Sequence, residues 1–174
     1  MNRFLNRLCL VFVVTGACSI AQAQSKEQSI LSAPLQPVTP SKRGVVFTSR
    51  LARQFGMQCS RQSPTGYWTN IAPSQNEVTS LENALPMWMK SQRSHRWDGR
   101  WDDRFFDYYF QYGALVRGKK RLIYINALPS SQQDRRQVWR RGPQVVCDGG
   151  PNFWGVEFDP QTRRFQNASF NGRL

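Results

Sequence analysis

The sequence is poor in the side chains on which most catalytic and metal sites depend. Its 174 residues include one histidine, His95, and four cysteines. A lone imidazole without a G-x-S-x-G or reactive-cysteine motif supplies no nucleophile with an oriented base. The few cysteines lie far from that histidine, which excludes the usual zinc spacings. We therefore predict no metal and no cofactor, and we favour a protein that is not an enzyme.

The chain is also too short for many enzyme architectures. With 174 residues it has the length of one domain, which excludes an α/β-barrel enzyme or a two-domain dehydrogenase. Hydrophobic residues make up 40% of the sequence and aromatic residues 13%. These fractions are enough for a packed core and exclude wholesale disorder.

No apolar run is long enough to cross a bilayer, which takes about 20 residues. The longest run, residues 8–14, follows two arginines and precedes an A-x-A site that ends at residue 23. This order is typical of a secretory signal peptide. We predict a signal over residues 1–23 with cleavage before Gln24. Lipid attachment at Cys18 is the alternative, although Thr15 stands where such sites usually have Leu or Val.

Cleavage would remove two of the cysteines and leave Cys59 and Cys147. We expect the mature protein in the periplasm or outside the cell, where a remaining pair of cysteines is typical of one disulfide. The alternative is two buried free thiols.

Acidic residues are scarce relative to basic ones, with 11 Asp and Glu against 24 Lys and Arg. Loss of the two arginines in the signal leaves a formal charge of +11. Such a field attracts anionic partners. An exported protein meets little nucleic acid, so we expect an anionic envelope glycan, a lipid headgroup or an acidic protein as the partner.

Local patterns predict a leader and two helices. Residues 24–43 are rich in Ser, Gln and Pro, which predicts a disordered leader before one domain over residues 44–174. Apolar residues within 45–55 predict a short helix. Ser74 and Glu77 form a capping box that starts a stronger helix. The apolar stripe of this helix is typical of a core-facing surface: Val78, Leu81, Leu85, Trp88 and Met89.

The pattern then changes to period two. Residues 105–116 and 121–128 predict two antiparallel strands joined by a turn at residues 117–120. Gly118 stands at the first central position, which suits a type II′ hairpin. Further strands are predicted over residues 144–148, 153–158 and 163–170.

The two faces of this hairpin differ in composition. The even-numbered residues of its first strand are apolar or aromatic and face the predicted core. The turn sets a register that places Gly113 opposite Tyr124 and Gln111 opposite Asn126 on the other face, beside Tyr109. Because one helix covers one side of a sheet, we expect this second face to be wet or to line a groove. The alternative is that a second copy of the chain or a partner protein covers this face.

A connection over residues 129–143 adds positive charge to the predicted site. Exposed rings and amides would contact a ligand, and arginines would attract it. The predicted ligand-binding residues are Tyr109, Gln111, Tyr124, Asn126, Arg135, Arg136, Arg140 and Arg141.

Together these elements predict an α+β domain. One main amphipathic helix packs on an antiparallel sheet of four or five strands, with one disulfide. A strand, a helix and then a meander resemble the cystatin-like and nuclear-transport-factor-like architectures. Such scaffolds host inhibitors, binding modules and enzymes alike.

Two segments carry a further resemblance. They are YGALVRGKKRLIYINA at residues 112–127 and CDGGPNFWGVEFDP at residues 147–160, together with Phe170-Asn171-Gly172. The chain resembles a family of small exported bacterial proteins without an established activity. The resemblance implies export and a single domain, and it brings no catalytic residues.

These observations predict an exported, non-enzymatic binding module for an anionic envelope component or protein. An inhibitor or immunity-type role is one version of this function. The alternative is an envelope hydrolase that cleaves peptidoglycan or an ester, using His95 with Asp98, Asp102 or Glu157. Arginines interleave with those aspartates, which favours surface ion pairs over catalysis.

Overall fold

A computed structural model of the chain describes residues 42–92, 107–132 and 137–172. The chain divides into two units, Met1–Gln36 and Pro37–Leu174, and all of the described residues belong to the second. No helix within this described part is long and apolar enough to span a membrane.

Several predictions from the sequence concern residues outside the described ranges. They are the signal peptide, the leader up to residue 41, and the side chains His95, Asp98, Asp102, Arg135 and Arg136. Lys42 and Arg43, which the sequence analysis placed in the leader, form a turn that leads into the first strand.

The described residues form a sheet of six strands with two α-helices and four 3-10 helices. The strands are β1 (Gly44–Phe47), β2 (Tyr67–Trp68), β3 (Tyr108–Arg117), β4 (Lys120–Pro129), β5 (Trp154–Asp159) and β6 (Arg164–Phe170). The α-helices are α2 (Ser49–Ala52) and α3 (Gln75–Ser91). The 3-10 helices are η1 (Arg53–Met57), η3 (Ser130–Gln132), η4 (Val138–Arg140) and η5 (Gly150–Asn152).

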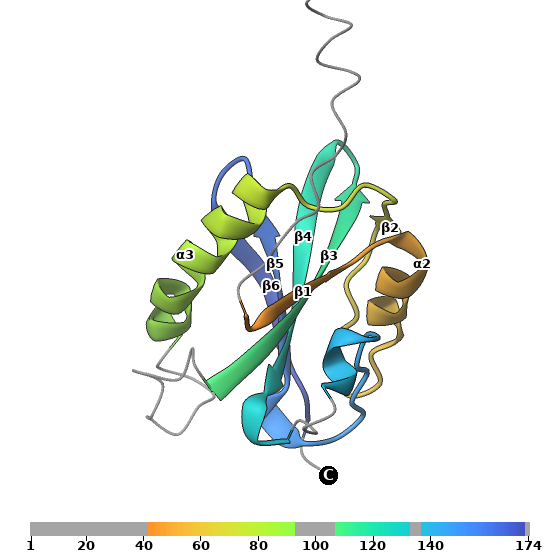
Figure 1. The fold of residues 1–174 in the computed structure, drawn as a ribbon, viewed down its shortest axis with the longest axis vertical. Helices are drawn as coiled ribbons and strands as arrows, with labels where there is room; N and C mark the ends of the chain where they lie inside the picture. The colour runs from red at the N-terminus through yellow and green to blue at the C-terminus, as the bar shows by residue number, and fades with distance from the viewer. Residues whose placement is uncertain (1–41, 93–106, 133–136, 173–174) are drawn as a thin grey trace, which may run out of the picture. The chain divides into compact units, whose positions relative to one another are not determined.

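The sheet is mixed, which corrects the prediction of an antiparallel one. Its strand order is β1-β3-β4-β5-β6, and β2 also pairs with β3 (Figure 1). β1 runs parallel to β3, while the other pairs are antiparallel. The helix predicted over residues 45–55 is wrong in its first part. Val45 and Val46 are β-branched residues that favour a strand, and they pair with β3; helical turns follow from residue 49.

The β3–β4 hairpin confirms the predicted register. Gly113 lies opposite Tyr124 and Gln111 opposite Asn126. Gly118 has a φ of 61°, a left-handed conformation that the turn requires and that glycine adopts without a steric penalty. The strands β5 and β6 agree with the predicted segments within one residue.

α3 covers one face of the sheet as predicted. The Ser74 hydroxyl accepts from the Glu77 N–H at 3.3 Å, and the Glu77 carboxylate accepts from the Ser74 N–H at 2.6 Å. The helix continues through Pro86. Its buried residues Val78, Leu81, Leu85 and Met89 pack with partly buried Trp88 against the apolar side of the hairpin and β5.

The opposite face is also covered, so the expectation that one helix leaves it exposed is wrong. α2 and η1 contribute Ala52 and Phe55, which pack against Tyr124 and its neighbours. Trp139 of η4 packs against Leu128. Figure 1 shows α3 and α2 on opposite sides of the sheet. This second layer is built from short segments. They have no strong hydrophobic periodicity, so the sequence patterns that predicted the long helix could not reveal them.

Residues 144–148 lie in this second layer and do not form the predicted strand. Side chains from the sheet and the C-terminal segment bind their backbone groups instead. The predicted disulfide between Cys59 and Cys147 is confirmed. It links this segment to the chain that follows η1.

Candidate functional site

Gln111 and Asn126 are fully buried, which corrects the prediction of exposed ligand-binding amides. The Asn126 amide donates to Gln111 Oε1 at 2.8 Å and to the Gln144 carbonyl at 2.9 Å. Gln111 donates to the carbonyls of Trp139 at 2.6 Å and Gly142 at 2.9 Å. Both side-chain amides therefore form hydrogen bonds with backbone groups of the covering segment, which is not paired with a strand in the described structure.

Arg61 extends this set of buried polar contacts. Its guanidinium donates to the side-chain oxygens of Asn126 and Asn171. Asn171 in turn donates to the carbonyls of Val146 at 2.6 Å and Asp148 at 2.9 Å. We call Gln111, Asn126, Arg61 and Asn171 the amide network. It fastens the coil around the disulfide to the sheet, so its members position the surface and do not face a ligand.

Tyr109 is half-buried and lies in a group of rings and cations. Its ring stacks on Trp139 with centroids 4.4 Å apart and planes 16° apart. The guanidinium carbon of Arg43 lies 5.7 Å from the Tyr109 ring centroid, and that of Arg140 lies 4.4 Å from the Trp139 ring centroid. Such contacts attract a cation to a ring face. We call Arg43, Tyr109, Trp139 and Arg140 the arginine–aromatic cluster.

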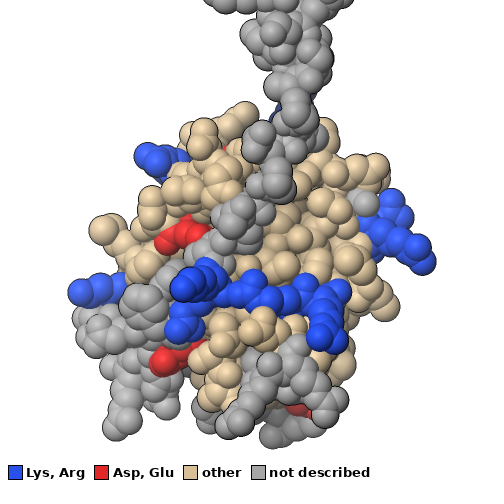
Figure 2. Space-filling view, viewed as in Figure 1, with Lys and Arg blue, Asp and Glu red and all other residues tan. Residues whose placement is uncertain are grey.

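Two further cations flank the arginine–aromatic cluster. Arg140 donates to the Lys42 carbonyl, and Arg141 follows it in the chain. Lys42, Arg140 and Arg141 are exposed, and within the described ranges none of them forms an ion pair with Asp or Glu. Figure 2 shows a band of Lys and Arg side chains across the face on which Figure 1 places the start of β1 and η4. This surface joins one predicted ring to two of the predicted arginines.

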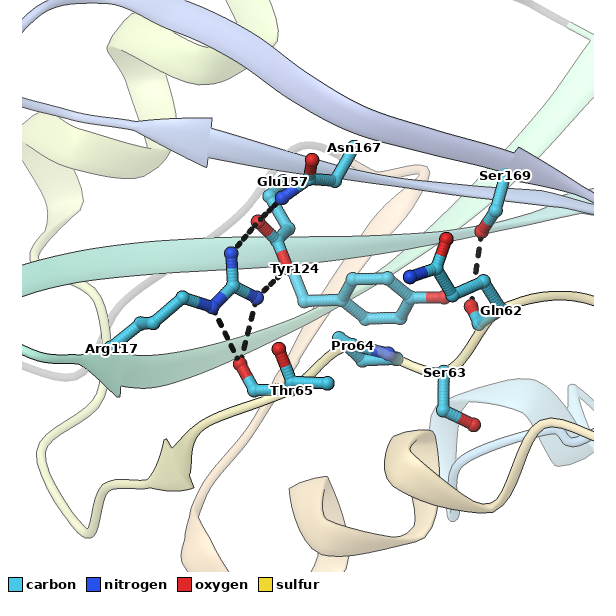
Figure 3. A pocket seen from close by; sticks show the side chains of 9 residues that line it. All are labelled: Gln62, Ser63, Pro64, Thr65, Arg117, Tyr124, Glu157, Asn167 and Ser169. Carbon is cyan, nitrogen blue, oxygen red and sulfur yellow. Dashed lines mark hydrogen bonds and ion pairs between the residues drawn. The ribbon is translucent and has the colours of Figure 1, made fainter.

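Tyr124, another predicted contact residue, lies away from that surface. It is 1% exposed and borders a separate pocket of about 80 Å³ between β4, β5, β6 and the chain before β2 (Figure 3). The lining residues are Gln62, Ser63, Pro64, Thr65, Arg117, Tyr124, Glu157, Asn167 and Ser169.

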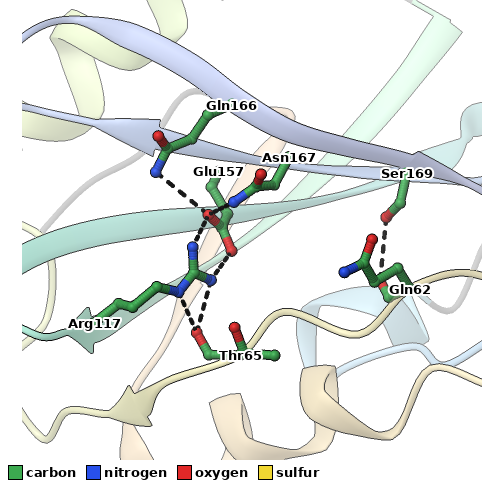
Figure 4. A network of polar contacts seen from close by, with 7 residues as sticks. All are labelled: Gln62, Thr65, Arg117, Glu157, Gln166, Asn167 and Ser169. Atoms are coloured by element: carbon green, nitrogen blue, oxygen red, sulfur yellow. Dashed lines mark hydrogen bonds and ion pairs between the residues drawn. The ribbon is translucent and has the colours of Figure 1, made fainter.

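An ion pair forms one wall of this pocket (Figure 4). Arg117 donates to both carboxylate oxygens of Glu157, whose side chain is 2% exposed, and also binds the Thr65 carbonyl at 2.7 Å and 3.0 Å. Asn167 donates to Glu157 at 2.8 Å. The hydrogen bond with Glu157 raises the pKa of Arg117. Arg117 and Asn167 thus hold the Glu157 carboxylate in place, which suits a structural or binding role.

Sequence reasoning missed several residues that shape these sites. Trp139 was missed although it stands next to the predicted Arg140, and an aromatic residue beside a cation is a visible signal. The contact of Trp139 with Tyr109 depends on the fold, because 30 residues separate the two rings in the sequence. Arg43 was missed because its Pro- and Ser-rich surroundings predicted a leader.

Comparisons of this chain with protein-family models, curated proteins and solved structures find no match. The resemblance to small exported bacterial proteins therefore stays a prediction. The function must be argued from the residues themselves.

Proposed function

We propose that the protein is an exported, non-enzymatic binding module that recognises an anionic component of the cell envelope or an acidic protein. The observation that carries this proposal is the arginine–aromatic cluster, with Lys42 and Arg141 beside it. Blocking another protein's acidic site, as an inhibitor or immunity protein does, is one form of this function.

The cluster refines how the ligand would be held. Tyr109 and Trp139 stack on each other and contact guanidinium groups, so the rings orient cations instead of stacking on a ligand. A planar guanidinium held in place loses less side-chain entropy when it binds phosphate or carboxylate oxygens, and it can bind them in bidentate fashion. The cluster therefore suits compact anionic groups such as phosphates and carboxylates.

Export is part of the same proposal. The mature chain would begin at Gln24 and reach the periplasm or the medium, with lipid attachment at Cys18 as the alternative. The order of strand, helix and meander supports the expected likeness to cystatin-like and nuclear-transport-factor-like scaffolds, which host binding modules among other functions. The hydrolase alternative would use His95 with Asp98, Asp102 or Glu157. Of these only Glu157 lies within the described residues, where it is bound by Arg117.

A binding experiment with three anionic probes tests the function. Purified protein is measured against phosphatidylglycerol vesicles, polygalacturonate and polyglutamate, with phosphatidylcholine vesicles as the uncharged reference. The variant Arg140→Gln/Arg141→Gln should weaken binding to the preferred probe by about 30-fold, from roughly 1 kcal/mol per cation at an anionic surface. Salt should weaken it further.

A matched variant separates the site from the total charge. Arg163→Gln/Arg164→Gln also removes two positive charges, from the exposed last turn residue and the exposed first residue of β6, and should cost only a few-fold in affinity. Equal losses in the two variants would show that binding follows net charge, and no binding to any probe would remove the proposal.

A further inference from the structure

The hydroxyl of Tyr124 is buried at the wall of the pocket, where Arg61 lies near it but no hydrogen bond of ordinary geometry forms among the described residues. Burial raises its pKa above the ordinary value of 10.0, with the nearby Arg61 acting in the opposite direction. The group therefore stays protonated at neutral pH and can donate a hydrogen bond. A buried hydroxyl usually has a partner in the protein, in ordered water or in a ligand.

The fold makes room for this hydroxyl in two ways. Gly155 lies beneath it, and a Cβ at that position would come within 2.0 Å of the Tyr124 oxygen. In addition, β6 contains an irregularity opposite Gly155 and Glu157, and Asn167 adopts a left-handed φ of 53° there. Irregular pairing of this kind re-aims side chains next to binding sites, and here it directs Asn167 onto Glu157.

The charges on the pocket wall neutralise each other. Arg117 and Glu157 form the ion pair described above, and the Thr65 carbonyl takes the remaining Arg117 hydrogen bonds. An ionic ligand would have to break this pair. Neutral polar side chains also line the pocket, on Gln62, Ser63, Thr65, Tyr124, Asn167 and Ser169. Figure 3 draws the Gln62 side chain near the hydroxyl end of Tyr124.

We propose that this pocket binds an uncharged N-substituted acetamide, the group found in N-acetylated sugars and in N-acetylated peptides. Its volume of about 80 Å³ is several times the roughly 10–15 Å³ that one ordered water requires. The Tyr124 hydroxyl donates to the amide oxygen, and the carbonyl of the Gln62 side chain accepts from the amide N–H. The Pro64 and Tyr124 rings provide apolar contact for the methyl group.

This inference is independent of the proposed anion-binding function, because the pocket and the arginine–aromatic cluster share no residue. Titration with N-acetylglucosamine and with N-acetylalanine amide, followed by amide NMR shifts, tests it. Saturable shifts are expected at Gln62, Ser63, Thr65, Gly155 and Ser169. The two probes distinguish a sugar from a peptide as the source, and glucose is the reference without an acetamide.

Two variants test the contacts. Tyr124→Phe removes only an unpaired hydroxyl, so the fold should be kept, and the affinity should fall about three- to tenfold, the range of one hydrogen bond. Gln62 is exposed, and Gln62→Ala should lower the affinity by a similar factor. The control is Tyr112→Phe, because that hydroxyl binds Glu82 on the α3 side of the sheet; it should leave the affinity unchanged.

Each result decides the proposal. Saturable binding of either acetamide that Tyr124→Phe weakens and Tyr112→Phe does not would support it. It would be overturned if neither acetamide binds saturably, if glucose binds as well as N-acetylglucosamine, or if both Tyr124→Phe and Gln62→Ala bind like the natural sequence.

Discussion

The two faces of the sheet are covered by different means. On one face, the 17-residue helix α3 buries a continuous apolar stripe against aromatic and aliphatic side chains of the sheet. On the other, short segments contribute isolated rings such as Phe55 and Trp139. Buried polar side chains of the amide network then bind the backbone of those segments.

This difference shows how a small domain can hold a surface that is built on coil. Apolar burial is not directional and suffices for a regular helix. A segment without regular structure keeps backbone groups that must be paired when they are buried. Gln111 and Asn126 pair them, and the disulfide fixes the same segment to the chain after η1. The arginine–aromatic cluster therefore rests on a fixed support.

The largest effect is expected from removing the disulfide. Its cysteines are 88 residues apart in sequence, so the chain-entropy model gives about 4–5 kcal/mol for the double variant Cys59→Ala/Cys147→Ala. Urea unfolding at neutral pH measures this loss, with reduced natural protein as the control. A loss below about 1 kcal/mol would mean that the amide network alone holds the second layer.

A pair of single variants compares the two faces directly. Leu81→Ala on the α3 face should cost about 3 kcal/mol of unfolding free energy through the cavity it leaves. Asn126→Ala should cost about 2 kcal/mol because buried groups lose their partners. Hydrogen exchange should locate the damage, with residues 139–146 losing protection in Asn126→Ala while α3 keeps it. Uniform loss along the chain would contradict separate coverage of the faces.

The smallest effect concerns the start of α3, where the helix is tied to β4 by charge. Burial raises the pKa of Glu77, but hydrogen bonds from Arg121 and Ser74 outweigh it and hold that pKa below the ordinary value of 4.5. The stabilisation is present above the unfolded pKa and is lost as the pH falls through the lower folded pKa. Glu77→Gln should cost about 0.5–1 kcal/mol at pH 7, since the pair is partly exposed.

Unfolding curves of Glu77→Gln and the natural sequence at a series of pH values check this sign. The difference between them should shrink toward zero as the pH falls through the acidic range. A difference that stays constant would assign the effect to the capping geometry and not to the charge of Glu77.

Much of the fold followed from local patterns in the sequence. The capping box located the first turn of α3, and the stripe from Val78 to Met89 identified its buried side. Gly118 fixed the hairpin, so the pairing of Gln111 with Asn126 was predicted correctly. The same pairing was misread as an exposed site, because an alternation of polar residues does not reveal whether other segments cover them.

The candidate site was predicted only in part for the same reason. Tyr109 was predicted from the second face of the hairpin, and Arg140 and Arg141 from a basic connection. These three lie on one surface, whereas Tyr124 borders a different pocket. The β1 strand was missed because four residues carry little periodicity, and its parallel partner in β3 is more than 60 residues away.

The sequence by itself determined the long helix, the hairpin register and the disulfide partners. The helix and the hairpin depend on near neighbours and on turn geometry, and the disulfide was predicted from the expectation that signal cleavage leaves two cysteines. Only the tertiary structure decided what covers the amides of the sheet and which rings meet a guanidinium. Those contacts join segments that are distant in the chain and have no hydrophobic periodicity. Which polar side chains they bury is therefore decided only when the segments pack.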